Sequence, residues 1–262
     1  MKTKIKIIDG NNQFLINYAK ATSYQDLVRR CQQLNFGADH VYWTFDGMDS
    51  RAQRRALYQD YKNTTSRAKN KQDPTKYELL GKFKRGDLPA LGGITIIEKP
   101  GVEADDIIRS LVRLVAGPNV DIEIVSNDGD LVDLTALEGV TQPQGKMAPC
   151  CSCPTEIPLY KTLVGDAGDN IKGLKGFGDK AWEKLTAAER VCIQTNLDDD
   201  TAVFNHFVDF DEKLAKKLTE NWEQVKLWYK IVSPMWVSNE ELFKHLRTYP
   251  RNIMPSSDRM TM

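Results

Sequence analysis

The 262-residue sequence lacks any run of about 18 apolar residues, the length that a membrane-spanning helix needs. Its first residues, MKTKIKIIDGNN, reach an aspartate too soon for the apolar stretch of a secretory signal peptide. We therefore expect a cytoplasmic protein with no membrane association. An excess of one charge is also lacking, because 36 basic and 36 acidic residues cancel. The distribution of charge, rather than its sum, must then indicate any nucleic-acid partner.

Cysteine and histidine are scarce. The five cysteines are odd in number and follow no secretory signal, which argues against a disulfide framework. Cys150, Cys151 and Cys153 cluster in PCCSCP, but a structural zinc site commonly takes its four ligands from two pairs. No second cysteine pair exists, and the three histidines lie far away in the sequence. A loop of reduced thiols is therefore favoured over a zinc site.

Apolar segments with the length of buried strands alternate with helical patterns. The expected strands are Lys4 to Ile8, His40 to Phe45, Ile94 to Glu98 and Asp121 to Ser126. Helical patterns cover residues 12–35, with a break near 21–24, and Val102 to Val115. This alternation predicts an α/β domain with a mostly parallel sheet flanked by helices. From about residue 154 helical patterns dominate. We therefore expect an α/β core over residues 1–150 and a helical part over 151–262.

Acidic residues follow each expected strand. Because the carboxyl ends of parallel strands meet at one edge of a sheet, these side chains should gather there. They are Asp9, Asp46, Asp128 and Asp130, with Glu103, Asp105 and Asp106 at the start of a helix. Two bare charges 4 Å apart repel by roughly 4 kcal/mol at an effective dielectric of 20, so such a cluster needs cations.

Carboxylate oxygens select hard ions, Mg²⁺ or Mn²⁺ rather than zinc. Two such ions about 4 Å apart form a centre that cleaves phosphodiester bonds, because they activate water and neutralise the developing charge. An aspartate after a strand is often only a turn residue, and the NDGDL segment alone would fit a hairpin turn. The coincidence of acidic residues at four strand ends favours a metal centre instead.

Five segments resemble the 5′-nuclease (flap endonuclease) family, specifically its phage branch. They are IIDGNN, WTFDG, GVEADDII, SNDGDL and GDAGDNIKGLKGFGDKA, in the family's order and rough spacing. The match runs from Ile7 to Ala181, about two thirds of the chain. The resemblance implies a Mg²⁺-dependent nuclease with a PIN-like α/β core, acting as a monomer. Such an enzyme cuts branched DNA bearing a 5′ single strand or removes nucleotides from a 5′ end, including RNA primers in RNA–DNA hybrids.

By this resemblance, the seven acidic residues above fall on metal-site positions, and Asp166 and Asp169 form a second acidic pair in the same site. The glycine-rich GLKGFG segment, within residues 165–186, resembles the turn of a helix–hairpin–helix. Glycines let backbone N–H groups approach a phosphate closely. The family also holds a K⁺ ion there. The candidate DNA-binding residues of this turn are Gly173, Lys175, Gly176, Gly178 and Lys180.

A basic segment occupies residues 50–86 and should form an arch or clamp over the DNA, as the resemblance implies. Between Arg51 and Arg85 there are 11 basic and 3 acidic residues, a surplus of 8 that could neutralise phosphates. The candidate DNA-binding residues are Arg51, Arg54 and Arg55, with Tyr58 and Tyr61 suited to stacking on bases. Lys62 falls on the family's lysine that contacts the scissile phosphate. Where the family has an arginine three residues later this chain has Thr65, and Arg67 is the candidate substitute.

Two other interpretations remain open. The same core could belong to a nucleic-acid binding protein that does not cleave, or to an RNA-specific PIN ribonuclease. Toxin-like ribonucleases of that kind are usually about half this length and lack a helix–hairpin–helix, and a pure binding module would not need seven carboxylates.

Near the C-terminus, the stripe Leu214, Leu218, Trp222, Val225 and Tyr229 predicts one amphipathic helix over Glu212 to Val232, which we interpret as core packing.

Overall fold

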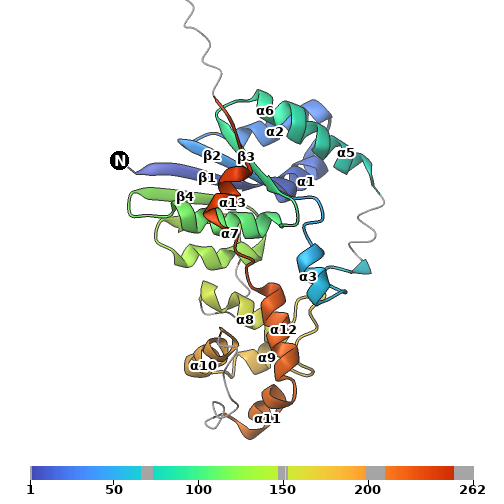
Figure 1. The fold of residues 1–262 in the computed structure, drawn as a ribbon, viewed down its shortest axis with the longest axis vertical. Coiled ribbons are helices and arrows are strands. Elements are labelled where there is room, and N and C mark those ends of the chain that lie inside the picture. Colours follow the sequence, from blue (N-terminus) through green and yellow to red (C-terminus); the bar gives the residue numbers. More distant parts are fainter. Residues whose placement is uncertain (1, 66–72, 147–150, 152, 199–209, 251–262) are drawn as a thin grey trace, which may run out of the picture.

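The computed structural model describes residues 2–65, 73–146, 151, 153–198 and 210–250. A six-stranded sheet has the strand order β5-β4-β1-β2-β3-β6 (Figure 1). Every neighbouring pair is parallel except β3 and β6, which are antiparallel. The strands are β1 (Thr3–Asp9), β2 (His40–Asp46), β3 (Ile94–Lys99), β4 (Val120–Val125), β5 (Val140–Thr141) and β6 (Leu246–Tyr249). The predicted mostly parallel sheet is confirmed.

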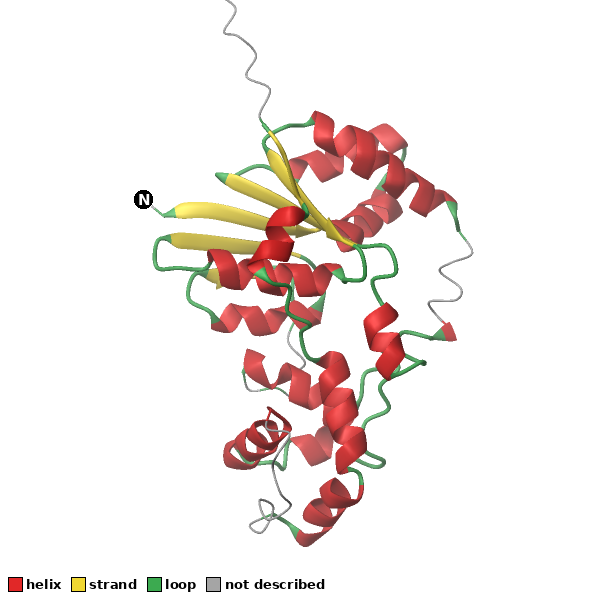
Figure 2. Cartoon of the chain, in the orientation of Figure 1, coloured by secondary structure: helices red, strands yellow, loops and turns green. Residues whose placement is uncertain are grey.

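Helices cover both faces of this sheet (Figure 2). One face packs against α1 (Gly10–Lys20), α2 (Tyr24–Gln33), α5 (Thr75–Lys82), the π-helical turn Phe83–Asp87 and α6 (Leu88–Ala90). The other packs against α7 (Ala104–Val115), the 3₁₀ segment Gly129–Ala136 and α13 (Asn239–Lys244). Ile7 and Ile8 are both fully buried, one in each of these two cores. Alternate side chains of β1 thus fill both layers, as a covered parallel sheet requires.

A separate core holds the helical half, drawn below the sheet in Figure 1. It contains the 3₁₀ turn Pro154–Glu156, α8 (Ile157–Val164), α9 (Asp179–Trp182), α10 (Ala187–Asp198), α11 (Glu212–Glu220) and α12 (Trp222–Val232). Helix α3 (Ala52–Leu57) lies between the sheet and this half and contacts α12. Within the described residues, no helix is both long enough and apolar enough to cross a membrane.

The C-terminal part differs from the expectation in two ways. The single helix over residues 212–232 is two helices, because the chain turns at Asn221, where α11 ends and α12 begins. Its apolar stripe does pack into the core, with Leu218 and Val225 fully buried, so that interpretation is confirmed. After α12 the chain returns to the sheet as α13 and β6, so residues 151–262 are not wholly helical. The domain boundary near residue 150 stays a prediction.

Candidate metal centre

The carboxyl ends of four adjacent strands bring acidic side chains to one edge of the sheet. Asp9 ends β1, Asp46 ends β2, and Asp128 follows β4. Glu103 and Asp105 enter after β3, from the start of α7. An oxygen of Asp46 accepts a hydrogen bond from the Ala104 N–H at 2.9 Å, which ties the end of β2 to the start of α7.

The innermost carboxylates interact with one another, and they are buried (Asp9) or partly buried (Asp105 and Asp128). Burial raises the pKa of Asp9 to about 7, and the charges of Asp46 and Asp128 add to this increase. Burial, followed by the charge of Asp128, raises the pKa of Asp105 well above its ordinary value. The pKa of Asp128 is raised by burial and by Asp130. Such shifts mean that the ionised cluster is costly alone and gains stability from a cation among these oxygens.

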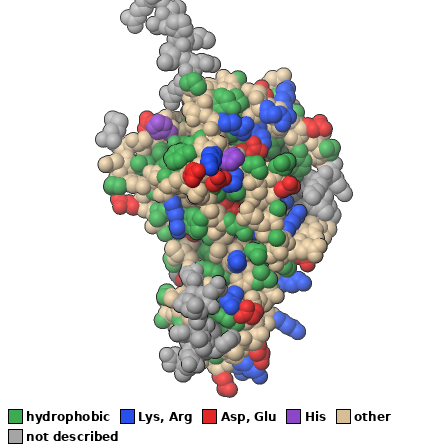
Figure 3. Space-filling view, viewed as in Figure 1, with side chains coloured by type: hydrophobic (Ala, Val, Ile, Leu, Met, Phe, Trp, Pro, Cys, Tyr) green, Lys and Arg blue, Asp and Glu red, His purple; other side chains and the backbone are tan. Residues whose placement is uncertain are grey.

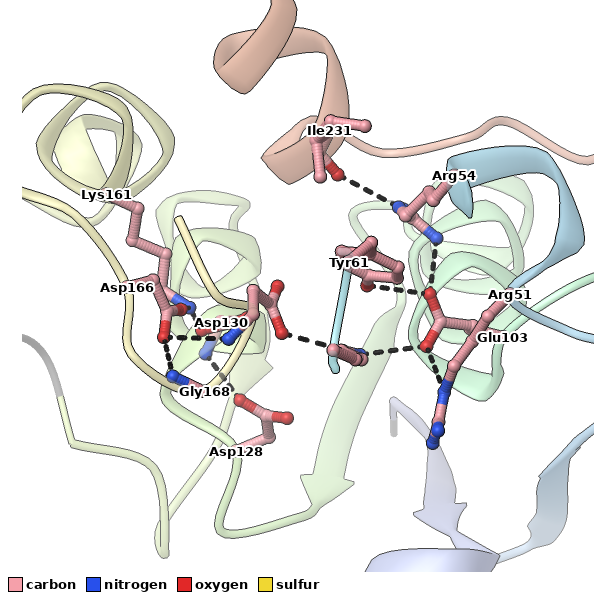
Figure 4. Close-up of polar contacts among 12 residues, drawn as sticks. Arg51, Arg54, Tyr61, Glu103, Asp128, Asp130, Lys161, Asp166, Gly168 and Ile231 are labelled. Atoms are coloured by element: carbon pink, nitrogen blue, oxygen red, sulfur yellow. Dashed lines mark hydrogen bonds and ion pairs between the residues drawn. The ribbon is translucent and has the colours of Figure 1, made fainter. Parts of the chain in front are cut away.

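A second acidic group lies beside the first, formed by Asp130, Asp166 and Asp169. Figure 4 labels Asp130 and Asp166. One oxygen from each of these carboxylates lies within 4.8 Å of the others. Asp166 and Ile171 exchange backbone hydrogen bonds at 2.8 Å, and the Asp166 carboxylate accepts the N–H of Gly168 at 2.7 Å. The tight turn of GDAGDN therefore holds these aspartates against the end of the sheet.

Lys161 of α8 is a site residue that the sequence reasoning missed. Its ammonium contacts both Asp130 and Asp166 (Figure 4). Burial alone would lower the pKa of Lys161, but these two carboxylates raise it above the ordinary value. The only sequence signal is a lysine five residues before Asp166, on a helix that leads into the acidic turn. The second acidic group is thus partly neutralised by the chain itself.

Lys62, expected at the scissile phosphate, also lies in this site. Its Nζ is 2.8 Å from Glu103 Oε1 and 3.7 Å from Asp169 Oδ1. Burial would lower the pKa of Lys62, but Glu103, Tyr61 and Asp169 raise it well above its ordinary value. The Lys62 N–H donates to the Asp169 carbonyl at 3.1 Å, and the Asn170 side chain donates to the Asp60 carbonyl at 3.0 Å. The lysine is therefore charged and anchored beside the second acidic group.

Arg54 requires a correction, because the structure places it in the interior instead of on a DNA-facing surface. Only 6% of Arg54 is exposed. Its guanidinium binds both oxygens of Asp106 at 2.6 and 2.8 Å. It also binds Glu103 Oε2 at 2.8 Å (Figure 4). Asp106 also accepts a hydrogen bond from the N–H of Met235, in the chain after α12. Both of its oxygens are therefore engaged inside the protein, and we do not include Asp106 among the metal ligands.

Tyr61 requires the same correction. It is 2% exposed, and its hydroxyl donates to Glu103 Oε2 at 2.8 Å, so its ring is not free to stack on a base. Glu103 also lies 3.6 Å from Arg51 Nε. Burial would raise the pKa of Glu103, but Lys62 and Arg54 lower it. Glu103 is therefore ionised, and it positions the basic side chains around the site. Its assignment as a metal ligand stays a prediction.

The remaining residues of the basic segment lie further out. Arg55 is exposed and donates to the Tyr61 carbonyl at 3.3 Å. Tyr58 is half-buried, and its hydroxyl donates to the Asn170 carbonyl at 3.1 Å. Arg67 lies outside the described residues. The structure thus brings the start of the basic segment, residues 51–62, to the metal centre.

The glycine-rich turn lies between α8 and α9. Gly173 needs its positive φ of 66° and its missing side chain, because a Cβ there would lie 2.5 Å from the Val164 backbone. Leu174 and Phe177 anchor the turn in the core, while Lys175, Gly176, Gly178 and Lys180 are exposed. Helix α9 begins at Asp179, directly after the turn.

The cysteines form no metal site in the part of the chain that the structure describes. There, the one group of metal-ligating side chains whose ligand atoms lie within 4.8 Å of one another is Asp130, Asp166 and Asp169. Cys151 is buried in the helical core and Cys153 is partly buried. Cys150 lies outside the described residues.

A parallel sheet with an acidic centre at its carboxyl edge, joined to a helical half with a glycine-rich hairpin, defines a PIN-like α/β protein. The family model of the 5′-3′ exonuclease N-terminal resolvase-like domain matches residues 7–148. The chain belongs to this 5′-nuclease family.

Curated relatives agree with this assignment. The chain is 33% identical over 168 residues to DNA polymerase I of Caldicellulosiruptor bescii, a match that covers 56% of this chain and 18% of that protein. It is 31% identical over 140 residues to a 5′-3′ exonuclease of Aquifex aeolicus, covering 50% of this chain and 46% of that protein. The matched part thus spans less than half the length of either relative.

Solved structures show the same fold. The T5 D15 protein co-crystallised with metal ions superimposes with a TM-score of 0.65 at 19% identity, covering 87% of this chain and 89% of that chain. The T5 5′-exonuclease with bound divalent zinc ions gives a TM-score of 0.63 at 18% identity, again covering 87% of this chain and 89% of that chain. The resemblance therefore extends beyond the matched N-terminal domain into the helical half.

Proposed function

We propose that this chain is a metal-dependent, structure-selective 5′-nuclease that hydrolyses DNA phosphodiester bonds at 5′ flaps or 5′ ends. The observation that carries the proposal is the acidic edge itself. Carboxylates from four strand ends and from the GDAGDN turn lie together, with two half-buried lysines among them. Membership of the 5′-3′ exonuclease family and relatives of that name support it.

The donor set fits hard divalent ions, Mg²⁺ or Mn²⁺. All of the candidate ligands are carboxylate oxygens, and burial raises the pKa of several of them, which a bound cation would reverse. Asp9, Asp46, Asp105 and Asp128 would hold one ion, directly or through water, and Asp130, Asp166 and Asp169 a second. Such ions supply an activated water and neutralise charge on the phosphate.

The chain's own residues would do the rest of the chemistry. Lys62 remains protonated because its acidic neighbours raise its pKa, and its Nζ lies at the border of the two acidic groups. An ammonium there would stabilise negative charge that develops on the scissile phosphate. Glu103 holds Lys62 in this position, while Arg54 and Tyr61 hold Glu103. Arg67 stays a sequence-based candidate for the same task.

The substrate would be branched or 5′-ended DNA. The exposed lysines and glycines of the hairpin turn suit contact with the phosphates of a duplex, and the basic segment suits the single strand. An RNA–DNA hybrid presents the same backbone charge. A K⁺ ion at the turn and a monomeric state complete the proposal and rest on the family resemblance.

A cleavage assay with three labelled substrates tests this function. A 5′-labelled flap, a nicked duplex and a single-stranded RNA are incubated with Mg²⁺, with Mn²⁺ and with EDTA. Release of short 5′ products from the first two, only with metal, is the expected result. Binding without cleavage in every metal would indicate a binding protein, and cleavage confined to RNA would indicate a ribonuclease.

A further inference from the structure

Helix α11 places a lysine directly against the hairpin turn. The Lys217 ammonium donates to the Lys175 carbonyl at 2.9 Å. It also lies 3.8 Å from the point where a Cβ on Gly176 would stand. An ammonium carries three donors, and this hydrogen bond uses one of them. Lys217 forms no ion pair with any carboxylate in the described part of the chain. Its charge therefore stays available at the exposed apex of the turn.

The backbone beside Lys217 offers open donors. The amides of Gly176 and Gly178 donate no hydrogen bond to any described residue. No described atom lies within 4 Å of a Cβ built on Gly178, and only Lys217 Nζ lies that close to one built on Gly176. Exposed backbone N–H groups and a neighbouring ammonium can bind the same anionic oxygen.

More lysines line the groove between the turn and α11. The groove has a volume of about 440 Å³, and Lys184, Lys213 and Lys217 border it. Its two acids are used locally: Asp211 accepts the N–H groups of Lys213 and Leu214, and Glu189 accepts the Thr186 N–H. Figure 3 shows basic side chains projecting from this helical half, interspersed with acidic ones.

The two lysines on one face of α11 would gain from an anionic partner. Lys213 and Lys217 are four residues apart, so they share one helix face and repel each other. The side chain of Lys213 forms no polar contact within the described residues, and neither does that of Lys184. Leu218, on another face of α11, is buried in the core. Packing therefore fixes which face of the helix carries the two lysines.

We propose that Lys213 and Lys217 of α11, with Lys184, extend the hairpin turn into a phosphate-binding surface for duplex DNA. This surface would hold the backbone of the duplex behind the cleavage point while the metal centre acts on the 5′ end. The proposal rests on the proposed nuclease function for its substrate. Its own content is that α11, which no motif in the sequence marks, contributes to duplex affinity.

Duplex binding in EDTA, where no cleavage occurs, tests the proposal across a salt titration. The double variant Lys213→Ala/Lys217→Met keeps most of the apolar stem of Lys217 while removing both charges. Each lost phosphate contact lowers the slope of log affinity against log salt by about 0.9, so the slope should fall by about two. Affinity should fall about tenfold at low salt, while binding of a single strand should change little.

Lys216→Met is the matched control, because Lys216 lies on the same helix, is 73% exposed and pairs with Glu220. It should leave affinity within about twofold of the wild type and the slope within about one unit. Lys217→Arg should keep most of the wild-type affinity for duplex DNA, since it keeps the charge. Lys213→Ala alone removes no polar contact seen among the described residues, so we expect it to fold as the wild type does.

The outcomes separate this inference from the proposed function. Equal slopes for the double variant and for Lys216→Met would overturn the inference, even if the wild type cleaves flaps. A wild type that binds duplex DNA through these lysines but never cleaves would overturn only the nuclease. A wild-type protein with no affinity for duplex DNA would overturn the proposal of a phosphate-binding surface. A loss of single-strand and duplex binding together would also overturn it, since the surface is assigned to duplex alone.

Discussion

Arg54 and Asp106 form a two-point ion pair in the interior of the protein. The two terminal guanidinium nitrogens lie 2.6 and 2.8 Å from the two carboxylate oxygens. Arg54 Nε also donates to the Ile231 carbonyl at 2.9 Å, at the end of α12. One side chain thereby joins the start of the basic segment, the acidic helix α7 and the helical half.

This pair predicts a large loss of stability when one partner is removed. Arg54→Gln leaves the buried Asp106 without its cation and removes one of the cations beside Glu103, which costs about 3–5 kcal/mol of the free energy of unfolding. Urea denaturation followed by circular dichroism measures the change. Arg55→Gln is the control, because Arg55 is exposed, and it should lie within about 1 kcal/mol of the wild type. Equal stability of the two variants would contradict the role assigned to Arg54.

The site also shows what the sequence could and could not predict. Asp9, Asp46 and Asp128 were predictable because each follows an apolar strand, and strand ends of a parallel sheet meet. The Arg54–Asp106 pair was not, since its members lie 52 residues apart and neither strand nor helix periodicity encodes such a contact. Strand β6 was also missed. Its segment LRTY is short and polar, and it pairs with β3 from the far end of the chain.

Asp128→Asn should nearly abolish cleavage and leave DNA binding intact. The substitution removes a charge from the metal centre, but no cation that contacts phosphate. We expect a decrease in the single-turnover rate of about 10³-fold or more, since loss of one well-placed stabilising group already costs about 10²–10³. Rate and affinity are measured separately, in Mg²⁺ and in EDTA.

Asp121→Asn is the matched control for Asp128→Asn. Asp121 lies on β4, the strand that Asp128 follows, but it forms an exposed ion pair with Lys2 at 3.1 Å. It should cleave at nearly the wild-type rate. If the Asp128→Asn enzyme cleaved as fast as this control, the assignment of Asp128 to the metal centre would be wrong.

Without divalent metal, stability should rise as the pH falls from about 8 to 6. Burial raises the pKa of Asp9 from 3.8 to about 7, and burial raises that of Asp169 to about 6. These acids bind protons more tightly in the folded state, so their ionisation above pH 7 destabilises the fold, and protonation relieves this cost. Thermal unfolding in EDTA at several pH values measures the trend.

Mg²⁺ should weaken or reverse this pH dependence. A bound cation favours the ionised carboxylates, and its binding releases their protons, so the ion stabilises the fold more at pH 8 than at pH 6. The melting temperature in Mg²⁺ minus that in EDTA should therefore increase with pH. A difference that is constant over this range would mean that the buried aspartates are not the ligands.

Lys62→Ala and Gly176→Val should have separate effects, the first on the cleavage rate and the second on DNA affinity. Lys62 lies among the acidic groups, so its loss should lower the single-turnover rate by about 10²–10³ while duplex affinity changes little. Gly176 has a φ of 71°, and its Cβ would stand 3.8 Å from Lys217 Nζ. A valine there strains the turn and crowds the open amides, so affinity should fall while the rate at saturating enzyme is mostly kept.

Gly37→Val is the control for backbone strain, since Gly37 has a φ of 86°, open space around it, and a position outside the hairpin turn. If Gly37→Val weakened DNA binding as much as Gly176→Val, strain alone would explain both, and the turn would lose its assigned role.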